Sequence, residues 1–293
     1  MLGQLLIALR EGFEAALITT VILAYLIRIE RRSLTKYVWM GVYLSIALSF
    51  LIGATIWVTY GILPKEAQVL FEGVAALVAV VVLTSMIYWM ALKGRRIKEE
   101  IEGKLRSLVR EEVMVVSGRS SVSAYLLQKR AAIAFITLSF IVVFREGLET
   151  VLFLTPFMIT TPQETLAGAA LGIGAAIILA YLFYKIGMTL NLRRFFYYTS
   201  ILLTLLAAGL AGYGTHELLE YSESIGVELG WVAEPAYALN ISSDSLIHHK
   251  GALGSIFAVL FGYTIKAEWL RLIVHITYLV IALPLPIRTY RKK

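Results

Sequence analysis

The sequence contains no cysteine, and charged residues make up only 16% of its 293 residues. The absence of cysteine excludes disulfide bonds, thiolate metal sites and thiol catalysis. The scarcity of charge argues against a soluble fold, because 59% of the residues are hydrophobic and the mean hydropathy is +0.77. A soluble domain of this length cannot bury so much apolar side chain. We therefore predict a multi-pass protein of the cell membrane.

The net charge of the chain is +7, which in a soluble protein would suggest a nucleic-acid partner. Here most lysines and arginines fall in short loops between apolar stretches, so we expect no nucleic-acid binding. These basic loops alternate with loops that carry few basic residues. By the positive-inside rule, the N-terminus is predicted to lie outside and the C-terminus in the cytoplasm.

Seven apolar stretches are long enough, or nearly so, to cross the hydrocarbon core of a membrane as helices. They span residues 4–27, 37–60, 67–92, 131–157, 165–188, 196–219 and 266–287. A further apolar segment at 253–265 is too short to cross, so an interfacial or re-entrant piece is predicted there. The stretches lack the alternation of membrane strands, and the predicted fold class is therefore all-α.

The helices and loops divide the chain into four predicted parts. Residues 1–92 form a first three-helix repeat, 93–130 a cytoplasmic loop, 131–220 a second three-helix repeat, and 221–293 an outer loop, the short apolar segment and a last transmembrane helix. Because each repeat crosses the membrane three times, the two repeats have opposite orientations. We expect an inverted 3+3 repeat plus one C-terminal helix.

Two similar motifs place charge inside predicted helices, where charge is costly. LREGFEAAL contains Arg10, Glu11 and Glu14, and FREGLETVL contains Arg145, Glu146 and Glu149. The charges of the first motif also favour a mature helix over a signal peptide. In each motif the two glutamates share a helix face, and the arginine can reach the second glutamate. Since the two helices run in opposite directions, both motifs are expected at the same depth, near the bilayer centre.

Four carboxylates at this depth repel one another unless they are protonated, paired or bridged by a cation. The two arginines leave the empty cluster with a formal charge of −2, which a divalent ion would neutralise. A carboxylate set without cysteine or an adjacent histidine favours hard, oxygen-seeking cations. The alternative is a structural salt bridge between the two helices, but one glutamate per arginine would suffice for that.

The paired motifs resemble those of the iron permeases, the oxidase-dependent ferric permeases of fungi and their bacterial iron-uptake relatives. The resemblance extends through GLAGYGTHELLE and GALGSIFAVLFGY and covers essentially the whole chain. It implies a high-affinity permease, not an enzyme, that imports iron, with the ferric ion favoured. It also implies that the metal ligands are Glu11, Glu14, Glu146 and Glu149, with Arg10 and Arg145 in support.

The resemblance implies iron, as Fe3+ or Fe2+, as the transported substrate, and no prosthetic group. It also implies a separate oxidase or peroxidase as protein partner. Glycine-rich faces at 168–172 and 209–214 are compatible with a homo-oligomer, although packing within the chain explains them better. The alternatives are a carrier of another hard cation such as manganese or lead, a membrane metal sensor, and a membrane enzyme that uses the glutamates for proton chemistry.

A second group of residues near the predicted outer face could act in iron entry or relay. It consists of Glu72, His216, Glu217 and Glu220. His216 and Glu220 are four residues apart and share a helix face, although solvation of a helix end would explain them as well. The outer loop is acidic, which raises the local cation concentration. His248 and His249 are expected to be exposed, and His275 to be packed or hydrogen-bonded.

Overall fold

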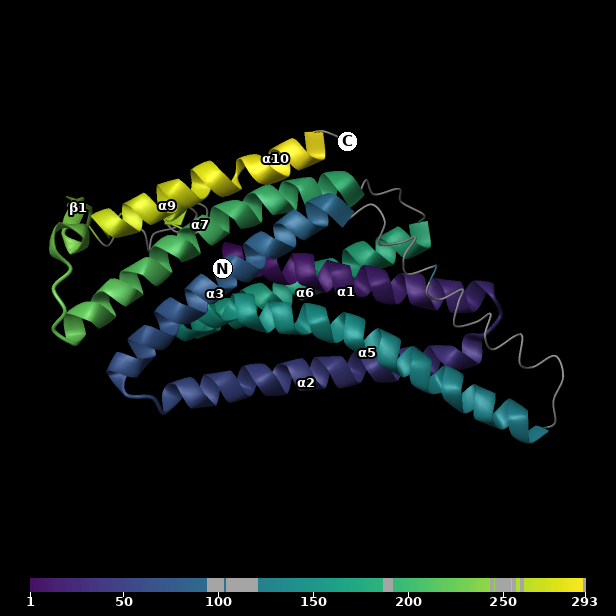
Figure 1. Cartoon of the computed structure of the whole chain (residues 1–293). Coiled ribbons are helices and arrows are strands. Elements are labelled where there is room, and N and C mark those ends of the chain that lie inside the picture. The colour runs from purple at the N-terminus through teal and green to yellow at the C-terminus, as the bar shows by residue number, and fades with distance from the viewer. Residues whose placement is uncertain are drawn as a thin grey trace.

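The computed structural model describes residues 1–93, 103, 121–186, 192–242, 245, 254, 257–258 and 261–291. In this part of the chain, long helices form a bundle with one small sheet at its end (Figure 1). The helices are α1 (Leu2–Arg28), α2 (Thr35–Gly61), α3 (Lys65–Lys93), α5 (Ser121–Thr160), α6 (Pro162–Ile186), α7 (Leu192–Ser224), α9 (Trp269–Ala282) and α10 (Pro284–Arg291). Strands β1 (Pro235–Ala238) and β2 (Lys266–Glu268) pair antiparallel. Short 3-10 turns occur at Arg32–Leu34 and Gly230–Ala233.

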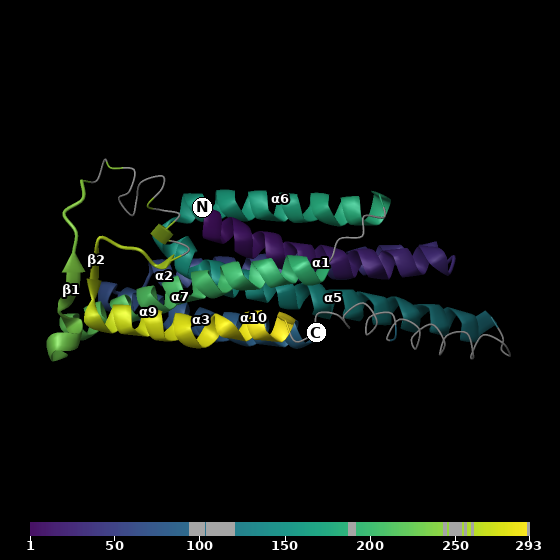
Figure 2. The same cartoon turned by 90° about the horizontal axis from the view of Figure 1, so that it is seen from above.

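Each predicted apolar stretch coincides with helical structure, which confirms the all-α fold class. Within the described residues, six helices are long and apolar enough to cross a membrane: α2, α3, α5, α6, α7, and α9 together with α10. Helix α1, with 27 residues, has sufficient length but carries the charges of its motif. It lies beside α6 in both views (Figures 1 and 2).

Two predicted boundaries differ from the ends of the helices. The last stretch, 266–287, is not one helix, because Lys266–Glu268 pairs with β1 and α9 begins only at Trp269. Pro284 then begins α10, as expected for a residue without an N–H group. Helix α5 begins at Ser121, so the predicted loop at 93–130 is shorter than expected. Most of that loop, most of the 253–265 segment, and His248 and His249 lie outside the described residues.

The six helices α1 to α7 pack in three main pairs. Helix α1 packs on α6, α2 packs on α5, and α3 packs on α7, while α9 covers α7 (Figure 2). Glycines permit close approach within these pairs. A side-chain carbon at Gly168 or Gly172 in α6 would collide with the backbone of α1, and one at Gly214 in α7 would contact α3. Packing within the chain thus accounts for these glycines, as the sequence analysis favours.

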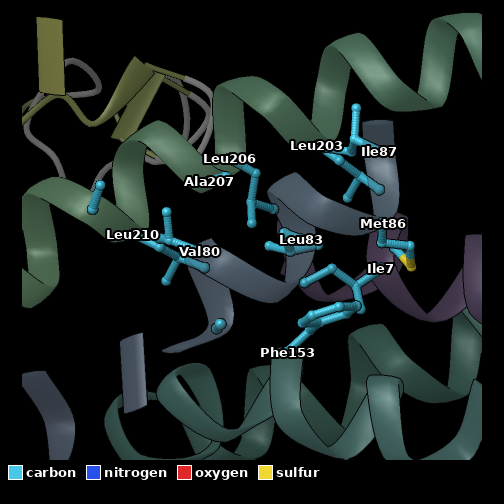
Figure 3. Packing of buried hydrophobic residues seen from close by; sticks show 12 residues of the cluster. Ile7, Val80, Leu83, Met86, Ile87, Phe153, Leu203, Leu206, Ala207 and Leu210 are labelled. Carbon is cyan, nitrogen blue, oxygen red and sulfur yellow. The ribbon is translucent and has the colours of Figure 1, made fainter. Parts of the chain in front are cut away.

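A buried apolar cluster joins the α3–α7 pair to the two motif-bearing helices. Most of its residues come from α3 and α7, including Leu83, Met86, Leu203 and Leu206 (Figure 3). Helix α1 contributes Ile7, one turn before the first motif, and α5 contributes Phe153, one turn after the second motif. The cluster therefore fixes both motifs against one common surface.

Candidate metal centre

The two charged motifs meet where α1 packs against α5. Glu11 of α1 and Glu146 and Glu149 of α5 each offer a carboxylate oxygen, and these oxygens lie within 4.8 Å of one another. Glu11 is fully buried, and Glu146 is 4% exposed. Three carboxylates from two helices thus converge inside the bundle.

In the first motif, the arginine contacts both glutamates of the same motif. Arg10 is fully buried and donates a hydrogen bond of 2.7 Å from Nη1 to Oε1 of Glu11. Its Nη2 lies 3.1 Å from Oε1 of Glu14. The same Nη1 atom also lies 3.1 Å from the sulfur of Met86 on α3. Glu14 therefore forms an ion pair with Arg10, although neither Nη2 of Arg10 nor Oε1 of Glu14 makes a hydrogen bond with the described residues, and it lies outside the group of three carboxylates.

The second motif is more open. Arg145 donates a hydrogen bond of 2.8 Å from Nε to Oε1 of Glu149, and this nitrogen lies 3.9 Å from Oε1 of Glu146. The side chain of Arg145 is 46% exposed, and its guanidinium lies over the ring of Trp89 on α3, 4.9 Å from the ring centroid. The guanidinium of Arg145 is therefore covered on one face by Trp89, and about half of the side chain is not covered by the protein.

One oxygen of each converging carboxylate has no protein partner. The Oε2 atoms of Glu11, Glu146 and Glu149 are buried and accept no hydrogen bond from the described residues. A buried unsatisfied polar atom costs about 1–3 kcal/mol, and more when it is charged. Three converging carboxylates, each with one unpartnered oxygen, form the kind of donor set that hard or borderline cations bind.

Comparisons with known proteins identify the family of the chain. The Iron permease FTR1 family matches the chain over residues 1–288. The chain belongs to the iron permease family.

The permease has relatives in archaea and bacteria. It is 42% identical to an uncharacterized protein of Archaeoglobus fulgidus over 290 residues, 99% of this chain and 96% of that protein. It is 34% identical to the ferrous iron permease EfeU of Yersinia pestis over 289 residues, 97% of this chain and 92% of the relative. It is 38% identical to EfeU of Escherichia coli O6:H1 over 212 residues, 72% of this chain and 71% of the relative. No solved structure matches the chain. Family membership makes the protein a multi-pass membrane transporter of iron rather than an enzyme.

Of the predicted entry or relay residues of the permease, Glu72 is separate from the others. Its two carboxylate oxygens accept hydrogen bonds from the hydroxyl groups of Tyr60 on α2, at 2.6 Å, and of Tyr213 on α7. Glu72 thus joins three helices and has both oxygens satisfied. His275, as expected, is hydrogen-bonded: its Nδ1 lies 2.9 Å from the carbonyl oxygen of Ala208.

The other three predicted residues of the permease gather near the end of α7. His216, Glu217 and Glu220 each offer a ligand atom within 4.8 Å of the others. Glu268 of β2 lies beside the first of them, with its Oε2 at 3.2 Å from Nδ1 of His216.

Sequence reasoning missed three residues that contact these two groups. Met86 and Trp89 are uncharged and lie in an apolar helix, so nothing in the local sequence marks them. Glu268 stands in a short charged stretch between apolar segments, which resembles any membrane boundary. The packing of α9, which Glu268 directly precedes, on α7 brings it to His216.

Proposed function

We propose that this permease imports iron into the cytoplasm through a site formed by Glu11, Glu146 and Glu149 between α1 and α5. The observation that carries the proposal is the set of three buried, unpartnered carboxylate oxygens on two different helices. A salt bridge between helices would leave no such surplus. Glu14, the fourth predicted ligand, serves in this proposal as the second partner of Arg10.

The arginines have a defined role in the empty site. Four glutamates and two arginines give the paired motifs a formal charge of −2, so a divalent ion brings the site to neutrality. A carboxylate at this depth without compensation costs a few kcal/mol. Arg10 and Arg145 limit that cost when the ion is absent and weaken ion binding enough to permit release.

We assign Fe2+ as the transported ion. The relatives from Escherichia coli and Yersinia pestis are named ferrous iron permeases. Fe3+, which the resemblance to oxidase-dependent permeases favours, is the alternative, and it would require an oxidase or peroxidase partner. Carriage of manganese or lead would use the same carboxylates and would appear as competition with iron.

We further propose that the fold is an inverted repeat, with the first unit at 1–92, the second at 131–220, and the N-terminus outside. The pairing of helices supports this proposal. The first helix of each unit packs on the second helix of the other unit, and the two third helices pack on each other. A two-fold relation between the units requires this exchange of partners.

The contacts of equivalent glycines support the same relation. Gly168 approaches Met1, Gln4 and Leu5, and Gly41 approaches Ile136, Ser139 and Phe140. Along the sequence, the first set precedes Arg10 by the same numbers of residues as the second set precedes Arg145. The glycine inside each motif behaves alike, because Gly12 contacts Ala176 of α6 and Gly147 contacts Ser49 of α2. Matching contacts on both sides support the proposal that the two motifs occupy corresponding positions at one depth.

Uptake of radiolabelled iron into proteoliposomes tests the proposed function. We expect uptake of Fe2+, kept reduced, by the wild type and its loss in Glu149→Gln. The matched control is Glu66→Gln, at an exposed glutamate in the first turn of α3. Normal uptake by a folded Glu149→Gln variant would contradict the assignment of the site. Uptake of Fe3+ alone would contradict the assigned oxidation state, and metal binding without any uptake would favour a sensor.

A further inference from the structure

We propose a second cation site in the permease, formed by His216, Glu217, Glu220 and Glu268, that binds a divalent first-row transition ion. Its role in loading the inner site rests on the proposed function above, but its binding of metal does not. The site lies where the last turns of α7 meet the small sheet, at one end of the molecule (Figure 1).

The geometry of α7 supplies three donors on one side of the helix. His216 and Glu220 are four residues apart and Glu217 lies between them, so all three side chains can reach a common point. Their ligand atoms lie within 4.8 Å of one another. Glu217 is 8% exposed and the side chain of His216 is 35% exposed, while Glu220 is exposed. The cluster is therefore buried on one side and open to an arriving ion on the other.

Glu268 provides an independent observation from a separate element. Its side chain is 10% exposed, and its Oε2 atom is buried without a hydrogen-bond partner among the described residues. This oxygen lies 3.2 Å from Nδ1 of His216 but is not aligned with it for a hydrogen bond. Two donors bound to one ion at roughly 2.1 Å, in octahedral geometry, would be about 3 Å apart. The spacing therefore suits two neighbouring ligands of a shared cation.

The sheet holds Glu268 in this position. Glu268 is opposite Pro235 in the β1–β2 pair, and the next residue, Trp269, donates its backbone N–H to the carbonyl oxygen of Glu234 at 3.1 Å. The carboxylate thus projects from a fixed backbone between β2 and α9. A ligand held in this way loses little conformational freedom when a metal binds.

Donor chemistry selects the class of ion. One imidazole with three carboxylates suits borderline divalent ions such as Fe2+, Mn2+ and Zn2+ better than Ca2+ or Mg2+, which prefer oxygen ligands alone. Arg271 lies within electrostatic reach of Glu217 and Glu268. Glu72 also lies within electrostatic reach of Glu217, so the carboxylates of this region outnumber its one arginine, and a bound cation would offset the excess negative charge.

The proposed site is distinct from the inner carboxylates. Helix α3 contacts both regions: Glu72 bonds Tyr213 of α7, one turn before Glu217, and Met86 contacts Arg10. These two positions on α3 are separated by about 21 Å at a rise of 1.5 Å per residue. One ion cannot bridge that distance, so the two groups must bind separate ions. Glu72, which lies within electrostatic reach of Glu217, stands on the inner side of the new site.

Binding stoichiometry of Fe2+ tests the site on the purified full chain in detergent, under anaerobic reducing conditions. We expect two ions per wild-type chain. His216→Gln and Glu268→Gln are each expected to weaken one of them by roughly ten-fold or more. Glu223→Gln, at an exposed glutamate on the same helix, is the matched control and should bind as the wild type. The double variant Glu11→Gln/Glu149→Gln should lose the inner ion only.

X-ray absorption at the iron edge gives a second readout that a purely structural role would not change. Loaded with one Fe2+, the Glu11→Gln/Glu149→Gln variant should show imidazole scattering, and the addition of His216→Gln should remove it. Unchanged affinity for both ions in His216→Gln and Glu268→Gln, or oxygen-only ligation in the inner double variant, would overturn the outer site. Retention of both ions by the inner double variant would instead contradict the proposed inner site, so the two failures are distinguishable.

Discussion

The two copies of the Arg-Glu-Gly-x-Glu motif differ most in their arginines. Arg10 is fully buried, contacts both glutamates of its motif and meets the sulfur of Met86. Arg145 bonds mainly to Glu149 and is 46% exposed beside Trp89. Met86 and Trp89 lie three residues apart on one face of α3, so one helix contacts both arginines. Identical local sequence thus gives similar ion pairs, but the neighbouring helix decides how far each pair is buried.

This difference separates a fixed countercharge from a movable one. Arg10 cannot leave its glutamates without placing an unpaired charge in the core, which costs several kcal/mol. Arg145 is less enclosed by the protein, because 46% of its side chain is exposed on the surface of the bundle. We therefore expect the first motif to act as the rigid wall of the iron site and the second motif to adjust when the ion enters or leaves.

The largest expected effect is that of Arg10→Met on stability. The substitution leaves Glu11 and Glu14 buried without their partner, and breaking a buried pair in this way costs about 3–5 kcal/mol. Thermal unfolding in detergent should show a clear decrease in midpoint. Adding Glu14→Gln should recover part of the loss, because it removes one of the stranded charges. A midpoint within error of the wild type would contradict the fixed role of Arg10.

Arg145→Gln is expected to change iron binding more than stability. Arg145 is less enclosed than Arg10 and bonds mainly to one glutamate, so the unfolding midpoint should fall less than in Arg10→Met. The site becomes more negative, and Fe2+ should bind roughly five-fold more tightly, which corresponds to about 1 kcal/mol. Uptake should then show a lower half-saturating concentration and a lower maximal rate, since release is slower. Weaker binding would indicate that Arg145 positions Glu149 rather than balances its charge.

Glu14→Gln separates the ligand group from the paired glutamate. Glu14 lies outside the three converging carboxylates, so the variant should still bind iron at the inner site. The loss of affinity in Glu14→Gln should be at least ten-fold smaller than in Glu149→Gln, which removes a direct ligand. Equilibrium binding of Fe2+ to both variants checks this. Equal losses of Fe2+ affinity in Glu14→Gln and Glu149→Gln would indicate that all four glutamates are ligands, as the sequence predicts.

The smallest expected effect is that of Trp89→Leu. This change removes the aromatic face under Arg145, a contact of about 0.5–1 kcal/mol at an exposed position. We expect a small shift of the uptake rate in the direction of Arg145→Gln and an unfolding midpoint near that of the wild type. Trp39→Leu, at an exposed tryptophan on α2, is the control. A large loss of stability would assign Trp89 to the packing of the core instead.

Most of the helical fold could be predicted because membrane helices are marked by local composition. The predicted stretches match α1 to α7 closely, since length and hydropathy are properties of consecutive residues. The break before α9 was missed because Lys266–Glu268 becomes a strand only through its partner β1. The early start of α5 was missed because its first turns are not apolar, so hydropathy does not mark them.

The candidate site was predictable in its residue types but not in its grouping. Helical spacing placed Glu146 and Glu149 on one face, and the duplicated motif pointed to Glu11 as their counterpart. The four-residue spacing already put Arg10 within reach of Glu14, but which of the four glutamates converge depends on how α1 packs against α5, and no local pattern encodes that. For the same reason Glu268 could not be predicted as a neighbour of His216.

Anomalous diffraction at the iron edge, from crystals of the Fe2+-loaded permease, tests the central claim most directly. We predict a peak between α1 and α5, at roughly 2.0–2.3 Å from one oxygen each of Glu11, Glu146 and Glu149. Arg10 should remain bonded to Glu11 and Glu14 in that structure. A loaded crystal whose only iron lies elsewhere, with the three carboxylates bonded to protein groups alone, would contradict the account.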